Sequence, residues 1–264
     1  MVPDHLAEHY SPGLEATRLT RSAHGRLEFL RTRELLRRLL PAPPARVLDV
    51  GGATGVHARW LARDGYRVHV VDPVAHHVEA AAALDDVTAE VGDARHLPAA
   101  TDSVDAVLLL GPLYHLAAAG DREAAILEAR RVLRAGGVLV AAAISRYLSL
   151  LEVGTNGELS EDLIRPVAEV IETGAYDGHV GFVGGHWHTA DELRDEVRSC
   201  GFSDVEVYGV EGPAWPTLDA IGDESSDASQ DAALRCARLV ERDPLMLHAS
   251  AHFLAVATAP LQRP

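Results

Sequence analysis

The segment Val47-Leu48-Asp49-Val50-Gly51-Gly52-Ala53-Thr54-Gly55 is the most informative stretch of the chain. Apolar residues lead to an acidic residue and then to a turn of small residues, and a helical pattern follows over His57–Arg63. Glycines permit positive φ angles and let a ligand approach the backbone closely. The backbone N–H groups of such a turn, with the N-terminus of the following helix, can hold a ligand. We therefore predict a buried strand, a ligand-binding turn and a helix.

The glycine spacing of this turn argues against a dinucleotide site. The turn reads Gly-Gly-x-x-Gly, whereas the dinucleotide fingerprint is Gly-x-Gly-x-x-Gly. Asp49 stands just before the turn, where its carboxylate would repel a pyrophosphate. A cationic ligand with an amino group or a sulfonium suits this carboxylate better. The segment therefore favours a cationic ligand over a nicotinamide dinucleotide.

Two further acidic residues follow the next predicted strands. Asp72 ends the apolar run Tyr66–Asp72, and Asp93 follows Val87–Val91. Ligands of open α/β sheets bind in the crevice at the carboxyl ends of the strands, so these acids should share one crevice with Asp49. Asp72 could accept both hydroxyls of a ribose, and Asp93 could reach an adenine amino group. Either residue alone would more often be a helix cap.

The order of these motifs resembles that of the class I S-adenosylmethionine-dependent methyltransferases. Residues 47–55 resemble their glycine-rich first motif, and residues 102–116 resemble their fourth strand and catalytic loop. Residues 131–140 resemble their fifth-strand motif, with Ala135 in place of a proline. The resemblance covers about residues 45–145 and the C-terminal strands, and it implies S-adenosyl-L-methionine as the cofactor. The cofactor-binding residues predicted within the core are Asp49, Gly51, Gly52, Ala53, Gly55, Asp72, Pro73, Asp93, Ala94 and Leu110.

Strand and helix patterns alternate up to residue 145, which predicts an α/β fold with a mostly parallel sheet. The resemblance implies a Rossmann-like, seven-stranded sheet with helices on both faces and an antiparallel last strand. Residues 1–45 read as an N-terminal helical lid that ends at Pro41–Pro44, because prolines stop helices. Residues 46–264 form the predicted core domain, with cap inserts at about 145–189 and 211–249.

The N-terminal segment is rich in arginine. Its apolar residues repeat at helical spacing, so we expect the arginines of residues 31–38 on a solvated face. Small-molecule enzymes of the resembling class fold such a helix over the cofactor, which implies that an arginine could pair with the methionine carboxylate. The candidates considered in this segment are Tyr10, Arg18, Arg26 and Arg31, of which we select Arg26.

His115 is the candidate general base. It follows the predicted fourth strand within Gly111–Leu116, the loop that faces the sulfonium in the resembling enzymes. Tyr114 could orient an acceptor. Both side chains could instead pack beneath the loop. A base is needed only when the acceptor carries a proton that it does not release unaided.

His186 and His188 are a second pair of catalytic candidates, flanking Trp187. In an extended segment both imidazoles point to one face, where they could bind a substrate carboxylate, act as a base or ligate a metal. No further ligand stands out nearby in the sequence, so we predict no metal site. Thr189, ahead of the next helical pattern, reads as an N-cap.

The composition of the chain bears on which classes of partner we expect. The net charge of −15 over 264 residues counts against a nucleic-acid substrate, because phosphate neutralisation by basic side chains dominates such binding. No apolar run reaches the length of a membrane-spanning helix, and the first residues lack the pattern of a signal peptide. We expect a cytoplasmic monomer or homodimer that has no nucleic-acid or membrane partner.

The leading interpretation is S-adenosylmethionine-dependent methylation of an N, O or C atom of a small molecule, a specialised metabolite. The Gly-Pro-Leu-Tyr-His segment at Gly111–His115 resembles small-molecule enzymes of bacterial antibiotic pathways. An alternative is a protein of this fold that binds the cofactor but catalyses a non-methylating reaction such as a cyclisation. A nicotinamide-dependent dehydrogenase is a more distant third. We expect the two inserts to determine the acceptor.

Overall fold

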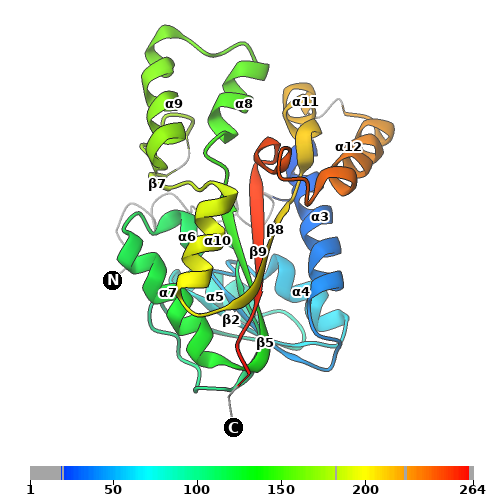
Figure 1. Cartoon of the computed structure of the whole chain (residues 1–264). Coiled ribbons are helices and arrows are strands. Elements are labelled where there is room, and N and C mark those ends of the chain that lie inside the picture. Colours follow the sequence, from blue (N-terminus) through cyan, green and yellow to red (C-terminus); the bar gives the residue numbers. More distant parts are fainter. Residues whose placement is uncertain (1–18, 20, 182, 223–224, 262–264) are drawn as a thin grey trace.

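The computed structural model describes residues 19, 21–181, 183–222 and 225–261. These residues form a seven-stranded sheet in the order β3-β2-β1-β4-β5-β9-β8 (Figure 1). Strands β1 to β5 run parallel, and β9 runs antiparallel to β5 and β8. The predicted mostly parallel sheet with an antiparallel last strand is confirmed. The strands are β1 (Arg46–Val50), β2 (Arg67–Asp72), β3 (Val87–Val91), β4 (Val104–Leu109), β5 (Leu133–Ile144), β8 (Ser203–Gly209) and β9 (His252–Thr258).

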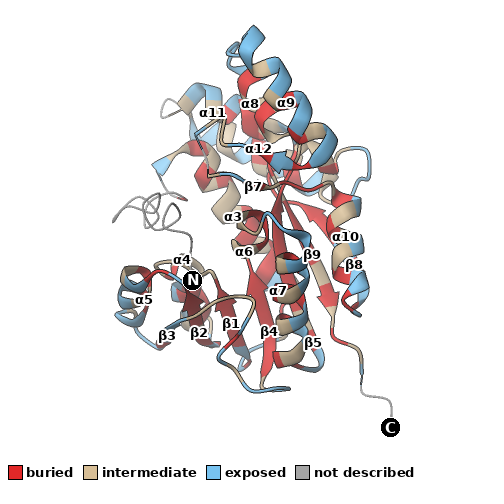
Figure 2. Cartoon of the chain, turned by 90° about the vertical axis from the view of Figure 1, so that its left-hand side faces the viewer, coloured by how far each residue is buried: buried red, intermediate tan, exposed pale blue. Residues whose placement is uncertain are grey.

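Helices cover both faces of the sheet, as predicted (Figure 2). Every residue of β4 is buried, and alternate residues enter two separate cores, with Leu109 on one side and Leu108 on the other. A strand covered on both faces reads as a continuous apolar run. One layer contains α3 (Ala23–Leu39), α4 (Val56–Arg63) and α5 (Ala75–Ala82), and the other contains α6 (Pro112–His115), α7 (Ala119–Val132) and α10 (Ala190–Ser199).

Two inserts interrupt the alternation near the positions expected from the sequence. The first separates β5 from α10 and extends beyond the end of the sheet (Figure 1). The second separates β8 from β9 and packs beside α3. The first contains α8 (Leu148–Thr155), α9 (Glu161–Thr173), β6 (Ala175–Tyr176) and β7 (Gly185–His186), and the second contains η1 (Gly212–Ala214), α11 (Trp215–Ile221), α12 (Asp227–Val240) and η3 (Leu247–Ala249).

Helix α3 is the described part of the predicted lid, and one of its arginines corrects an expectation. Arg31 is fully buried instead of lying on a solvated face. Its Nε donates to the carbonyl oxygen of Val210 at 3.2 Å, and its terminal nitrogen lies 2.7 Å from a carboxylate oxygen of Glu241. These partners come from chain segments far away in sequence, which helical spacing cannot reveal. Of the other N-terminal candidates, Tyr10 and Arg18 lie outside the described residues.

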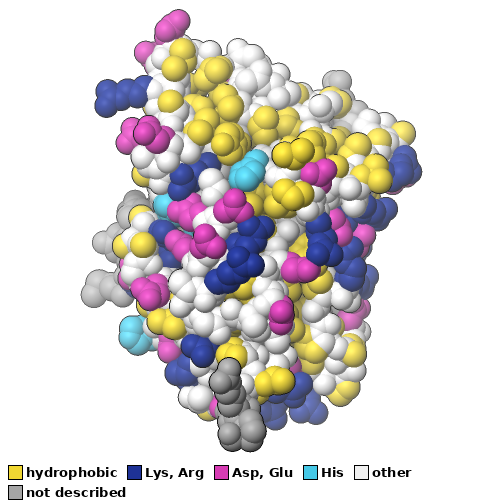
Figure 3. Space-filling view, viewed as in Figure 1, with side chains coloured by type: hydrophobic (Ala, Val, Ile, Leu, Met, Phe, Trp, Pro, Cys, Tyr) yellow, Lys and Arg dark blue, Asp and Glu magenta, His cyan; other side chains and the backbone are white. Residues whose placement is uncertain are grey.

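Two surface observations bear on possible partners. Among the described helices, none combines the length and the apolar character needed to cross a bilayer. On the face shown in Figure 3, arginine side chains are interspersed with acidic ones across the middle of the molecule. Charges of both signs are thus mixed on this face and the net charge of the chain is −15, whereas a concentrated positive field is what draws nucleic acids to a protein.

Candidate cofactor and acceptor site

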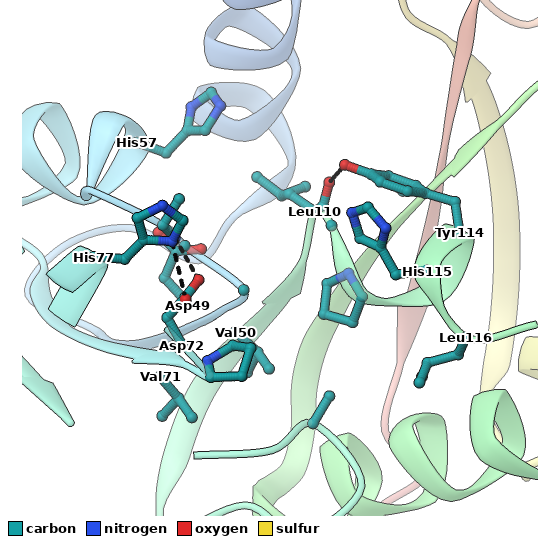
Figure 4. A pocket seen from close by; sticks show the side chains of 18 of the residues that line it. Asp49, Val50, His57, Val71, Asp72, His77, Leu110, Tyr114, His115 and Leu116 are labelled. Atoms are coloured by element: carbon teal, nitrogen blue, oxygen red, sulfur yellow. Dashed lines mark hydrogen bonds and ion pairs between the residues drawn. The ribbon is translucent and has the colours of Figure 1, made fainter. Parts of the chain in front are cut away.

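A cavity of about 540 Å³ lies along the carboxyl ends of the strands. Its lining runs from the ends of β3 and β2, past β1 and β4, to the end of β5 and the start of β9. Helix α3 closes one side through Glu28 and Thr32. Figure 4 shows Asp49, Asp72 and His77 on one side of this cavity, and Tyr114 with His115 across from them. The predicted cofactor residues that line it are Asp49, Gly51, Gly52, Ala53, Asp72, Pro73, Asp93, Ala94 and Leu110.

The carboxylate of Asp49 is buried beneath the glycine turn. The residue is 1% exposed, and neither carboxylate oxygen has a hydrogen-bond partner among the described residues. Burial, with a smaller contribution from the nearby carboxylate of Asp72, raises the pKa of Asp49 to about 7. A buried polar group without a partner is costly unless a ligand supplies one. An ammonium group of the ligand fits this position.

The glycines of the turn hold the backbone close to Asp49 and Pro112. Gly51 has a φ of +70°, and its N–H donates to the carbonyl oxygen of Val71 at 2.7 Å. A Cβ atom at Gly52 would lie 2.7 Å from the carboxyl carbon of Asp49. Gly55 is not among the described residues that line the cavity. It is the N-cap of α4, with a φ of +79°, so its role is to start the helix.

Gly52→Ala tests whether ligand binding requires a residue without a side chain at this position of the turn. We expect the affinity for S-adenosylhomocysteine to fall at least about tenfold, because the new methyl group displaces the Asp49 carboxylate from the ligand. Titration calorimetry measures this affinity. Gly154→Ala is the matched control, since a Cβ atom added there meets nothing within 4 Å. If Gly52→Ala binds S-adenosylhomocysteine with an affinity within twofold of that of the parent protein, the turn does not need to lie this close to the Asp49 carboxylate.

Asp72 is held rigidly at the end of β2. One of its carboxylate oxygens accepts from the N–H of Ala53 at 2.9 Å, and the other accepts from the N–H of Val74 at 2.9 Å. The second oxygen also lies 3.1 Å from Nδ1 of His77. His77 lines the cavity and was not identified from the sequence, although it stands in the first turn of the helix after Asp72. A carboxylate fixed in this way can still accept hydrogen bonds from a ribose.

Asp93 carries an arginine partner that the sequence analysis missed. A terminal nitrogen of Arg95 lies 2.6 Å from a carboxylate oxygen of Asp93, and Arg95 also pairs with Asp121 at 3.2 Å. The hydrogen bonds from the Arg95 side chain lower the pKa of Asp93. All three residues line the cavity, so this end combines a cation with two acids. A contact between Asp93 and adenine stays a prediction.

Tyr114 and His115 lie together on α6, which begins directly after β4. Both line the cavity, and their ring centroids are 4.8 Å apart. The Tyr114 hydroxyl donates to the carbonyl oxygen of Leu110 at 3.1 Å. The first insert packs against this helix, because a Cβ atom at Gly185 would overlap the carbonyl oxygen of Tyr114. The structure therefore places both predicted residues at the cavity, and their catalytic roles stay proposals.

The His186 and His188 pair lies elsewhere. The two rings are adjacent, with centroids 4.7 Å apart, as expected for an extended segment. Neither histidine is among the described residues that line the cavity. His186 Nε2 lies 2.8 Å from a carboxylate oxygen of Glu192, and His188 Nε2 lies 3.1 Å from one of Glu196. We do not retain these histidines as catalytic candidates.

The sequence did not reveal that Glu192 and Glu196 of α10 lie beside this histidine pair. Ligand atoms of His186, His188 and Glu196 lie within 4.8 Å of one another. The expectation that no metal binds there stays a prediction, which elemental analysis of untagged protein checks. Thr189 caps α10 as predicted, since its side chain accepts from the backbone N–H of Glu192 at 3.1 Å.

Arg26 does not line the cavity among the described residues. Its guanidinium donates to the hydroxyl of Ser225, a residue of the second insert, at 3.4 Å. Helix α3 instead presents Glu28 and Thr32 to the cavity. We therefore do not carry forward the predicted pairing of Arg26 with a methionine carboxylate.

The end of the cavity away from the glycine turn is lined mainly by residues of the sheet, and the two inserts contribute little to the lining. Gly184 is the one described residue of the first insert in the lining, and no described residue of 211–249 contributes. The wall at this end is formed by strand residues and their neighbours. They are Ala142, Ile144, Val210, His252 and Leu254.

Comparisons with known proteins agree with this geometry. Residues 48–141 match a family model described as a methyltransferase domain. The chain is similar to a solved S-adenosylmethionine-dependent methyltransferase of Thermotoga maritima, described as a possible histamine N-methyltransferase. The two are 21% identical with a TM-score of 0.61, and the match covers 97% of this chain and 99% of that one. No curated protein matches the chain in sequence.

Two further solved structures have the same fold. An S-adenosylmethionine-dependent methyltransferase of Mesorhizobium loti is 19% identical with a TM-score of 0.57, and the match covers 88% of this chain and 99% of that one. The [4+2]-cyclase SpnF is 18% identical with a TM-score of 0.53, and the match covers 89% of this chain and 82% of that one.

The chain therefore has the fold of the class I S-adenosylmethionine-dependent methyltransferases, and residues 48–141 match the model of a methyltransferase domain. The resemblance to class I S-adenosylmethionine-dependent methyltransferases that we inferred from the sequence is confirmed. The narrower likeness to enzymes of bacterial specialised metabolism stays a prediction.

Proposed function

We propose that this protein transfers the methyl group of S-adenosyl-L-methionine to an N, O or C atom of a small molecule. The observation that carries the proposal is the carboxylate of Asp49, which is buried beneath a glycine turn and has no hydrogen-bond partner within the described part of the chain. It lies in a cavity that continues to a mostly apolar end. The matched domain and the methyltransferases of the same fold support S-adenosylmethionine as the cofactor.

Different residues along the cavity would bind different parts of the cofactor. Asp49 would hold the ammonium group, and Asp72 would bind the ribose hydroxyls. Asp93 and Arg95 lie at the end where the adenine is expected. When bound, the cofactor supplies a methyl group on a cationic sulfur. The apolar wall of Ala142, Ile144 and Leu254 excludes water and orients the acceptor, which can supply much of the rate.

An acceptor screen tests the proposal. Purified protein with S-adenosylmethionine is offered a panel of phenols, amines and activated methylene compounds, and S-adenosylhomocysteine is measured. Calorimetric titration with S-adenosylmethionine, S-adenosylhomocysteine and NAD runs in parallel. We expect both adenosyl compounds to bind, NAD not to bind, and at least one acceptor to yield S-adenosylhomocysteine. Binding of NAD in preference to the adenosyl compounds would contradict the proposal.

The alternative is a non-methylating reaction on the same fold. The similarity in fold to the cyclase SpnF is the observation behind this second candidate function. Product formation that requires bound cofactor but releases no S-adenosylhomocysteine would favour it. A cytoplasmic location and a monomeric or homodimeric state stay predictions.

His115→Ala tests the loop after β4. We expect turnover of the acceptor found by the screen to fall at least about tenfold, while the affinity for S-adenosylhomocysteine stays within about twofold. The reason is that His115 lines the cavity next to Tyr114, on the side opposite Asp49. His96→Ala, at an exposed histidine, is the control. Unchanged turnover across the pH range would remove His115 from the mechanism.

A further inference from the structure

The acceptor end of the cavity contains a histidine that the sequence analysis did not single out. His252 is the first residue of β9 and pairs with Ile144, the last residue of β5. Both residues line the cavity. In the sheet order, β9 is separated from the cofactor turn on β1 by β4 and β5. His252 therefore belongs to the end where an acceptor would lie.

A fully buried carboxylate fixes the ring of His252. One oxygen of Glu211 lies 2.6 Å from Nδ1 of His252, and the other accepts from the backbone N–H of His252 at 3.0 Å. Glu211 has an exposed fraction of 0%. Because the carboxylate binds both the ring and the backbone of the same residue, the ring has one orientation relative to β9.

The neighbouring backbone keeps Glu211 in place. The N–H of Val210 donates to the carbonyl oxygen of His252 at 3.1 Å. On the other side, the N–H of Gly212 donates to the Ser250 hydroxyl at 2.8 Å. The end of β8 is thus bonded to the start of β9 on both sides of Glu211. Such a rigid arrangement is what a catalytic histidine needs from its orienting group.

We propose that His252 is the base that removes the proton of the acceptor, with Glu211 as its positioning residue. A carboxylate that accepts from Nδ1–H leaves the lone pair of a neutral imidazole on Nε2. The apolar residues around His252 fit a small, largely apolar acceptor whose reacting atom is a hydroxyl or amine that carries a proton. This proposal rests on the proposed methyl transfer.

The step balances without a further reagent. The O–H or N–H proton of the acceptor passes to Nε2 of His252. The acceptor atom forms a bond to the methyl carbon, and the carbon–sulfur bond breaks with its electron pair kept on sulfur. The imidazolium then returns its proton to solvent. His115, which lines the same cavity, is left to orient the acceptor.

Other titratable groups surround the pair. His24 of α3 has Nε2 3.9 Å from Glu211, and its Nδ1 lies 3.8 Å from Asp219 of α11. Glu28, Tyr114 and His115 also line the cavity. Ligand atoms of His24, Glu211 and His252 lie within 4.8 Å of one another, so a divalent metal ion is the competing occupant that the experiment must exclude.

Nitrogen NMR tests the tautomer without any acceptor. The full chain is labelled with 15N in its histidine rings and recorded near neutral pH with S-adenosylhomocysteine, and the signals of His252 are those lost in His252→Gln. We expect a proton on Nδ1 and none on Nε2, with this pattern altered in Glu211→Gln and kept in the control Glu206→Gln. A proton on Nε2, or on both nitrogens, overturns the proposal. Stoichiometric zinc that is lost in His24→Gln also overturns it.

Kinetics with the acceptor from the screen supply the second readout. We expect His252→Gln to lower kcat at least about a hundredfold and to abolish its rise with pH, while His115→Ala keeps that rise. Glu211→Gln should shift the pH profile and lower kcat more than it raises KM. A pH profile unchanged in folded His252→Gln overturns the proposal. If the screen finds no acceptor, the proposed function fails, and the NMR result still decides the histidine pair.

Discussion

Asp49→Asn will raise the stability of the ligand-free protein above neutral pH and weaken binding of the cofactor. The carboxylate of Asp49 is buried without a hydrogen-bond partner among the described residues, and burial raises its pKa from 3.8 to about 7. Ionising it in the folded state therefore costs free energy that the unfolded chain does not incur. That difference is at most about 4 kcal/mol, at 1.36 kcal/mol for each unit of pKa.

The sign of the pH dependence follows from the raised pKa. Below the unfolded value of 3.8 the acid is protonated in both states and costs nothing. The cost grows as pH rises from 3.8 to about 7 and is complete above that. A neutral asparagine removes this cost but leaves a buried amide, so we expect Tm to rise by roughly 5 °C at about pH 8 and by little at about pH 4. Calorimetric scans at both values measure the effect.

The same substitution should remove the partner of the ligand's ammonium group. Truncating one member of a buried charged pair costs about 2–5 kcal/mol, so the affinity for S-adenosylhomocysteine should fall at least about thirtyfold. In the parent protein, affinity should rise with pH up to about 7, because binding of the ammonium favours ionised Asp49. Asp85→Asn, at an exposed acid, is the control. A less stable variant at about pH 8 that still binds ligand would refute this role for Asp49.

Glu196→Gln will have the largest effect on stability. Glu196 of α10 accepts three hydrogen bonds from Arg122, the shortest at 2.7 Å, and pairs with the fully buried His188 at 3.1 Å. Burial alone would raise the pKa of Glu196, but the hydrogen bonds from His188 and Arg122 outweigh burial and lower it to about 2. Removing the charge leaves the buried guanidinium of Arg122 without a counter-ion, which costs about 3 kcal/mol or more.

This contribution has a defined pH window. Because the pKa is depressed from 4.5 to about 2, the stabilisation is complete above 4.5 and is lost as pH falls towards 2. The difference between parent and Glu196→Gln should therefore vanish near pH 2. Urea unfolding at several pH values measures it. Asp195→Asn on the same helix, whose side chain is 76% exposed, is the control. An equal loss in both variants would show that the ion pair is not the cause.

The cofactor half of the site was predictable because its signals are local. Asp49 lies near the end of one strand and the glycines follow that strand directly, and the pattern of apolar residues identified that strand and the next. The parallel order of the strands then brings Asp72 and Asp93 to the same edge as Asp49. Because these strands are parallel, their carboxyl ends lie at one edge of the sheet, and this was enough to predict that the three acidic residues lie near one another.

The residues that the sequence did not reveal depend on distant partners. Arg31 has helical spacing typical of a surface arginine, and its contacts with Val210 and Glu241, which are far away in the sequence, explain its burial. Glu211 and His252 are far apart along the chain and meet because β8 and β9 pair. A single sequence contains no periodic signal for such a pairing.

The position of β9 between β5 and β8 has a consequence for the order in which the site is completed during synthesis. The strands that contain or precede Asp49, Asp72 and Asp93 all lie within residues 46–91, so they are synthesised before β5, β8 and β9. The wall that contains His252 requires a strand near the C-terminal end, inserted between two that precede it. During synthesis the chain therefore contains the residues of the cofactor side before it contains those of the wall with His252.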